Sequence, residues 1–155
     1  MFQRQVHRSS AAVPDRRGPP WQLLVESPDP LLAISNFDAF RDAGFQVMVC
    51  GGPGVDAHEC PVVRGEPCPL MAAADVVLFD LDGEPPRRSE MLTASRSEVL
   101  AAMRANRPEL PIVVMSAAAP PDAATDCPTI RPITSVGGQV TALQKAVLQW
   151  PSPRA

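Results

Sequence analysis

Short, continuously apolar segments alternate along this chain with longer segments whose apolar residues recur every three or four positions. The short segments predict strands buried on both faces of a sheet, and they span 21–27, 45–49, 75–79 and 112–115, with a more polar edge strand at 129–133. The periodic segments predict helices. Strands that alternate with helices imply a single α/β domain, in which a doubly wound, mostly parallel sheet of five strands carries helices on both faces.

Two helices have clear start signals. Asp29-Pro30 joins a favoured N-cap residue to a proline suited to the first helical position. The apolar residues that follow recur every three positions and predict one buried helix face: Leu31, Ile34, Phe37 and Phe40. We expect Ile34 and Phe37 to pack on the sheet. Ser95 and Glu98 have the spacing of a capping box and predict the start of a later helix.

The composition sets the limits of the domain. Residues 1–20 are polar, rich in arginine and without apolar periodicity, so we expect a disordered N-terminal arm. The domain is predicted to span 21–150, and the proline-containing segment 151–155 is predicted to be a C-terminal tail.

Charge and hydropathy exclude several classes of function. The net charge is −3 and no basic block occurs, so we expect no nucleic-acid partner. No apolar run is long enough to cross a membrane, and the N-terminus lacks the apolar core of a secretory signal, so we expect a cytoplasmic protein without a membrane partner. Gly51–Gly54 precedes no clear helix and no Ser-His-Asp pattern is present, so we do not expect an enzyme.

Several polar residues fall at predicted strand ends, which meet at one edge of a parallel sheet, where ligands bind. Four segments carry them: VESPDPLL, ADVVLFDLDGEP, LPIVVMSA and TIRPITS. In this order they resemble the site motifs of CheY-like response-regulator receiver domains. The resemblance implies a flavodoxin-like fold with strand order 2-1-3-4-5. Measured against that fold, residues 50–70 replace the second helix by a loop of Cys, Pro and Gly, and residues 117–128 leave an eroded fourth helix.

The resemblance also implies roles for the strand-end residues. Asp80 falls on the phosphoacceptor, Glu26-Ser27 on the acidic pair that holds magnesium with it, and Ser116 and Arg131 on the hydroxyl and the cation that bind the phosphoryl group. Serine replaces one of the two acids, and arginine replaces lysine, whose compact ammonium it does not reproduce. We therefore expect inefficient phosphorylation and a regulatory module that acts by binding a protein partner. Asp80 as a solvated or loop-capping carboxylate is the other interpretation.

A loop rich in cysteine supports an alternative function. Cys50, Cys60 and Cys68 lie within nineteen residues, and His58 lies close to them. Thiolates and imidazole bind zinc, and thiolates hold iron–sulfur clusters, so the loop could serve a metal- or redox-sensing protein. The spacing lacks the C-x₂-C pair of common zinc sites. Plain thiols and a reversible Cys60–Cys68 disulfide are the other two interpretations.

Overall fold

A parallel sheet of five strands in the order β2-β1-β3-β4-β5 forms the centre of the computed structural model, as predicted. The structure describes residues 19–29, 31–53, 60–83, 94–118, 126–132 and 134–150. The strands are β1 (Trp21–Glu26), β2 (Phe45–Cys50), β3 (Val76–Asp80), β4 (Ile112–Met115) and β5 (Thr129–Ile130).

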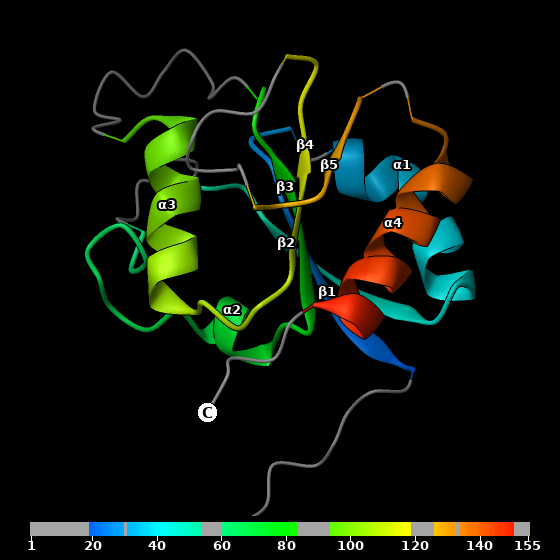
Figure 1. Ribbon diagram of the computed structural model, residues 1–155, viewed down its shortest axis with the longest axis horizontal. Helices are drawn as coiled ribbons and strands as arrows, with labels where there is room; N and C mark the ends of the chain where they lie inside the picture. The colour runs from blue at the N-terminus through cyan, green and yellow to red at the C-terminus, as the bar shows by residue number, and fades with distance from the viewer. Residues whose placement is uncertain are drawn as a thin grey trace, which may run out of the picture.

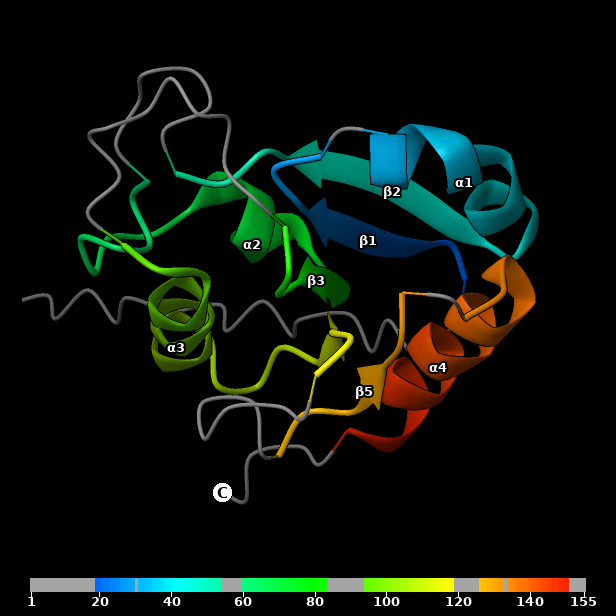
Figure 2. The same ribbon diagram turned by 90° about the horizontal axis from the view of Figure 1, so that it is seen from above.

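Helices cover both faces of this sheet (Figures 1 and 2). One face carries α1 (Leu31–Asp42) and α4 (Val136–Gln149), and the other carries α2 (Pro69–Ala73) and α3 (Arg96–Asn106). The predicted capping box starts α3: the Ser95 side chain accepts from the amide of Glu98, and the Glu98 side chain accepts from that of Ser95. The region expected to be a loop ends in α2, whose five residues are too few to show a helical period.

The predicted sheet core is confirmed. The apolar residues of β3 and β4 that we expected inside are at most 1% exposed: Val76, Val77, Leu78, Ile112, Val113 and Val114. Successive side chains of a strand point to opposite faces. Val77 therefore belongs to the cluster of buried residues between the sheet and helices α2 and α3, the α2/α3 core cluster. Leu78 belongs to the cluster on the opposite face, the α1/α4 core cluster. Both faces are buried, and this explains why the strands are apolar without alternation.

The predicted buried face of α1 is wrong. Phe40 is fully buried, but Leu31, Ile34 and Phe37 are exposed by 62%, 65% and 43%. A helix turns about 100° per residue, so residues spaced by three drift around it, and Leu31 and Phe40 lie about 180° apart. Ala33, on the same side as Phe40, forms the second buried contact of α1. An apolar stripe of Leu31, Ile34 and Phe37 is left on the outer surface of the helix.

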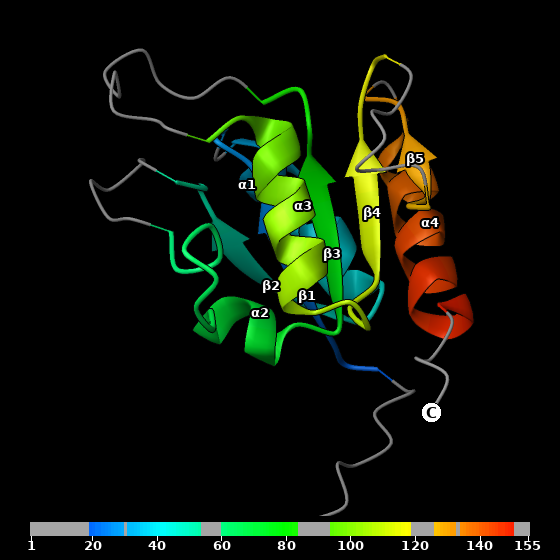
Figure 3. The same cartoon turned by 60° about the vertical axis from the view of Figure 1, so that its left-hand side comes forward.

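All strands point toward the same edge of the sheet (Figure 3). The pairing places the end of β1 beside the ends of its two neighbours, because Glu26 pairs with Cys50 and with Phe79. Asp80 pairs with Met115 in the same way. This carboxyl edge is where the strand-end residues meet.

Some predictions fall outside the described residues. They include the N-terminal arm up to residue 18, Pro30, His58, residues 119–125 of the eroded fourth helix and the tail 151–155. Among the residues that the structure places, no helix has the length and hydropathy needed to cross a bilayer.

Candidate functional site

Four of the predicted site residues lie together at the carboxyl edge. Glu26, Ser27, Asp80 and Ser116 are all buried there, with Asp80 the most exposed of them at 8%. The Ser27 hydroxyl donates to Asp80 Oδ2 at 2.7 Å and accepts from the Asp29 amide at 3.0 Å. Ser27 therefore connects the acidic end of β3 to the loop that leads into α1.

The neighbouring carboxylates are engaged in local structure. Asp29 Oδ1 accepts from the Leu31 amide at 2.9 Å and so caps the start of α1, as its sequence context predicts. Asp82 accepts from the Ser116 hydroxyl at 3.0 Å and from the Ala117 amide at 2.6 Å. The Ser116 hydroxyl is consequently directed to Asp82 and donates no hydrogen bond to Asp80.

Sequence reasoning missed Arg96, the first residue of α3. Its guanidinium forms a two-pronged pair with Glu26, in which Nη1 donates to Oε1 at 2.8 Å and Nη2 donates to Oε2. The same group donates to the backbone carbonyl of Asp80, from Nε at 3.1 Å and from Nη2 at 2.7 Å. Its Cζ lies 4.5 Å from the centre of the Phe79 ring, within the range of a cation–π contact.

Burial controls the protonation of Glu26. Its removal from water raises its pKa, since a carboxylate is poorly solvated in the protein interior. The hydrogen bonds and charge of Arg96 lower the pKa, and the negative charge of Asp80 raises it, but burial is the largest effect. Arg96 is therefore the group that favours the ionised form of Glu26 at this edge.

Arg131 lies apart from this arrangement. Its side chain is exposed, and its backbone carbonyl accepts from the Thr134 amide at 2.9 Å. No ion pair joins Arg131 to Asp80, although the structure describes both residues. The cation in contact with the residue at the end of β3 is Arg96 instead.

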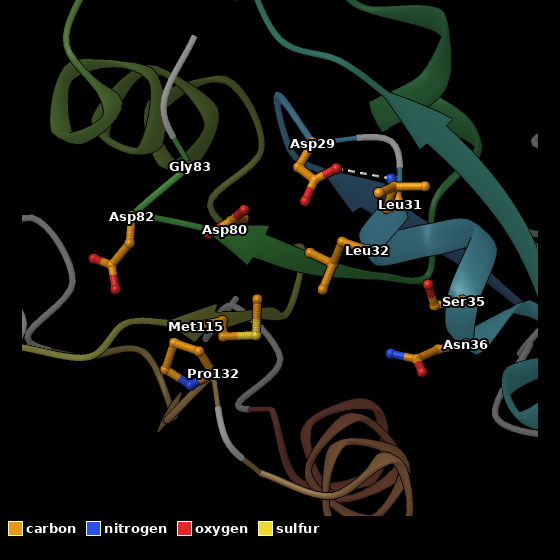
Figure 4. Close-up of a pocket in the computed structure, with 10 residues that line it drawn as sticks. All are labelled: Asp29, Leu31, Leu32, Ser35, Asn36, Asp80, Asp82, Gly83, Met115 and Pro132. Atoms are coloured by element: carbon orange, nitrogen blue, oxygen red, sulfur yellow. Dashed lines mark hydrogen bonds between the residues drawn. The ribbon is translucent and has the colours of Figure 1, made fainter.

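A pocket of about 620 Å³ opens over Asp80, between α1 and the ends of β3 and β4 (Figure 4). Three carboxylates line it, from Asp29, Asp80 and Asp82, together with apolar side chains that include Leu32 and Met115. At the rim of the pocket, the backbone of Gly83 lies close to the side chains of Pro28 and Asp80. A Cβ there would lie 2.5 Å from Pro28 Cδ and 2.9 Å from Asp80 Oδ2, closer than van der Waals contact allows.

All four cysteines lie in the described ranges, and all are free thiols in contact with the α2/α3 core cluster. Burial raises the pKa of Cys50. The hydrogen bond from the Gly52 amide lowers it, and the nearby groups Glu26, Cys60 and Cys68 raise it. Cys127 is buried, and its burial likewise raises its pKa. Within the described ranges, no three His, Cys, Asp or Glu side chains are grouped to hold a metal ion. His58 lies outside those ranges, so the metal site of the cysteine loop stays a prediction.

The residues that the resemblance assigns to magnesium do not supply its preferred ligands. Magnesium takes hard oxygen ligands, usually one or two carboxylates with several waters. Here both Glu26 oxygens accept hydrogen bonds from Arg96, and Ser27 supplies a hydroxyl that donates a hydrogen bond to Asp80. The Asp80 carboxylate is the one acidic group that this set leaves for a metal ion.

Comparison with known proteins supports the fold. No protein-family model and no curated protein matches the sequence. Solved structures do match. The response regulator receiver protein of Sinorhizobium medicae WSM419 is 18% identical with a TM-score of 0.59, and the match covers 84% of this chain and 97% of that protein. A CheY-like receiver domain protein of Methanospirillum hungatei JF-1 is 13% identical with a TM-score of 0.58, covering 82% and 93%.

A third similar structure holds a magnesium ion. It is the receiver domain of the sensor histidine kinase PA1611 of Pseudomonas aeruginosa PAO1, with magnesium coordinated in its active-site cleft. It is 15% identical to this chain with a TM-score of 0.54, and the match covers 82% of this chain and 97% of that domain. The chain thus has the fold of receiver domains.

Proposed function

We propose that this chain is a divergent receiver-like regulatory module that binds a protein partner and is not efficiently phosphorylated. The arrangement around Asp80 carries the proposal. An acyl phosphate develops negative charge that a cation and hydroxyl donors must stabilise. At this site the Ser116 hydroxyl donates to Asp82, and Arg131 makes no ion pair with Asp80 within the described residues. Neither predicted phosphoryl-binding group is therefore directed at the aspartate.

Phosphorylation is the direct test. After incubation with magnesium and acetyl phosphate, we expect intact-mass spectrometry to show little or no added phosphoryl group, because the charge transferred to Asp80 would lack these partners. Asp80→Asn is the matched control, since it keeps the size of the side chain and removes the nucleophile. A prompt, near-stoichiometric gain of one phosphoryl group that Asp80→Asn abolishes would restore the conventional receiver function.

The exposed stripe of α1 supports partner binding. Leu31, Ile34 and Phe37 are three exposed apolar side chains on successive turns of one helix, and clustered exposed apolar residues are typical of protein interaction sites. Leu31 also lines the acidic pocket, so the stripe continues into a region of negative charge. These features fit a partner helix with an apolar face and a basic end.

Substitutions on the stripe test this surface. We expect Ile34→Glu to abolish capture of a partner from cells that make this protein, while the free energy of unfolding changes by no more than about 0.5 kcal/mol, as for other exposed positions. Leu148→Glu, at a 64% exposed position of α4, is the control and should bind normally. Asp80→Asn should also bind the same protein. Binding that depends on Asp80, or that survives Ile34→Glu, would contradict the proposal.

The same proposal places the module in the cytoplasm and assigns it no catalytic activity. The cysteine alternative has less support. A thiol must lose its proton to become a metal ligand or a nucleophile, and burial raises the pKa of Cys50, one of the three thiols of that loop.

A further inference from the structure

We infer that the guanidinium of Arg96 takes the place of a divalent cation at the carboxyl edge of the sheet. Arg96 binds both carboxylate oxygens of Glu26 and the carbonyl oxygen of Asp80. Carboxylate and carbonyl oxygens are hard ligands of the kind that bind divalent cations. The inference deepens the proposed function and rests on it, because it explains how a receiver-like site is held together without metal.

The local structure of α3 does not explain an arginine at this position. The positive end of the helix dipole lies at the first turn, so a cation there is unfavourable. Arg96 is the first residue of α3, and the helix is already capped by Ser95 and Glu98. The favourable contacts of Arg96 are made with the ends of β1 and β3 instead. This indicates that the negative charge at the carboxyl edge of the sheet is what stabilises an arginine at this position.

The ion pair of Arg96 and Glu26 is largely buried. The exposed fractions of the two side chains are 15% for Arg96 and 3% for Glu26. Buried ions are stable only when their hydrogen bonds are satisfied. The guanidinium meets this condition with its bonds to Glu26 and Asp80, and one of its faces lies against the Phe79 ring.

The backbone of the loop after β2 also lies against the ion pair of Arg96 and Glu26. Gly52, in the loop after β2, has a φ of +82°, a conformation that favours glycine. A Cβ at this residue would lie 2.6 Å from Glu26 Oε1 and 3.1 Å from Arg96 Nη1. The backbone therefore approaches the ion pair too closely for any larger residue, and β1, α3 and this loop together enclose the cation.

Removal of the arginine should open a metal site. We expect wild-type protein to show no change in melting temperature with Mg²⁺ and no saturable binding of Mn²⁺ in titrations followed by electron paramagnetic resonance. In Arg96→Met the Glu26 carboxylate and the backbone carbonyl oxygen of Asp80 are left facing the vacated space. We expect this variant to bind Mn²⁺ at least about tenfold more tightly than wild type. Its melting temperature should be higher in the presence of Mg²⁺ than in its absence.

Two further variants keep the test decisive. Arg96→Met with Glu26→Gln lacks the freed carboxylate and should lose the gained affinity. Arg96→Gln, which retains a hydrogen-bond donor, replaces Arg96→Met if that variant folds poorly. Saturable Mn²⁺ binding by wild type, or the absence of any gain in the folded Arg96 variant, would overturn the inference. Neither result depends on phosphorylation or on partner capture, so the proposed function is judged separately.

Discussion

Replacement of Val77 by aspartate is expected to prevent the chain from folding. Val77 lies in β3, at the centre of the sheet with β1 and β4 as its neighbours, and its side chain is fully buried in the α2/α3 core cluster. An unpaired charge at such a position costs several kcal/mol. Domains of this size are stable by only about 5–15 kcal/mol, so this one change removes most or all of the stability.

Circular dichroism and the dispersion of amide NMR signals measure the result. Val49→Asp is the matched control, because Val49 lies on the edge strand β2 and is 47% exposed. We expect that variant to keep the native spectrum. A native-like spectrum for Val77→Asp would mean that β3 does not occupy the centre of the sheet.

The second large effect concerns the ion pair at the carboxyl edge. Arg96→Met leaves the Glu26 carboxylate buried without its partner, and we expect a loss of about 3–5 kcal/mol in the free energy of unfolding. Arg96→Met combined with Glu26→Gln removes both charges and should recover much of that loss. Urea denaturation of the wild type, both single variants and the double variant measures the coupling between the two residues.

The loss should depend on pH, with a sign that follows from the pKa of Glu26. In the wild type this pKa is raised, so the folded state binds more protons than the unfolded state, and stability falls as the pH rises from the ordinary value to the raised one. Arg96 lowers the pKa, so its removal raises it further and extends that range upward. The deficit of Arg96→Met should therefore be larger at about pH 8 than at about pH 5. A deficit that is equal at both pH values would contradict a buried Glu26–Arg96 pair.

Most of the fold was predictable because it depends on local patterns. Continuous apolar segments mark the strands that are covered on both faces, and β4 coincides with its predicted bounds at Ile112–Met115. The meeting of Glu26, Ser27, Asp80 and Ser116 follows from topology alone, since parallel strands end at the same edge. The error at α1 arose because a spacing of three was taken for one helix face, although only the Phe40 side faces the sheet.

The missed part of the site depends on tertiary structure. Arg96 is 70 residues from Glu26 along the chain, and the segment that leads into α3 carries no motif that indicates which strand end the arginine reaches. The capping box located the start of α3, but the direction of its first side chain depends on how the helix packs on the sheet. Arg131 was assigned by analogy with a lysine, and nothing in the residues around it required contact with Asp80.

The cysteines lie on one face of the sheet, so their reaction with alkylating reagents can report on the opening of that face alone. All four thiols contact the α2/α3 core cluster, while the described residues of the α1/α4 core cluster include no cysteine. Buried thiols react with alkylating reagents only when the surrounding structure opens, and sub-global openings occur in contiguous units. The rate of Cys127 alkylation therefore reports local openings of the α2/α3 core cluster around the segment that leads into β5.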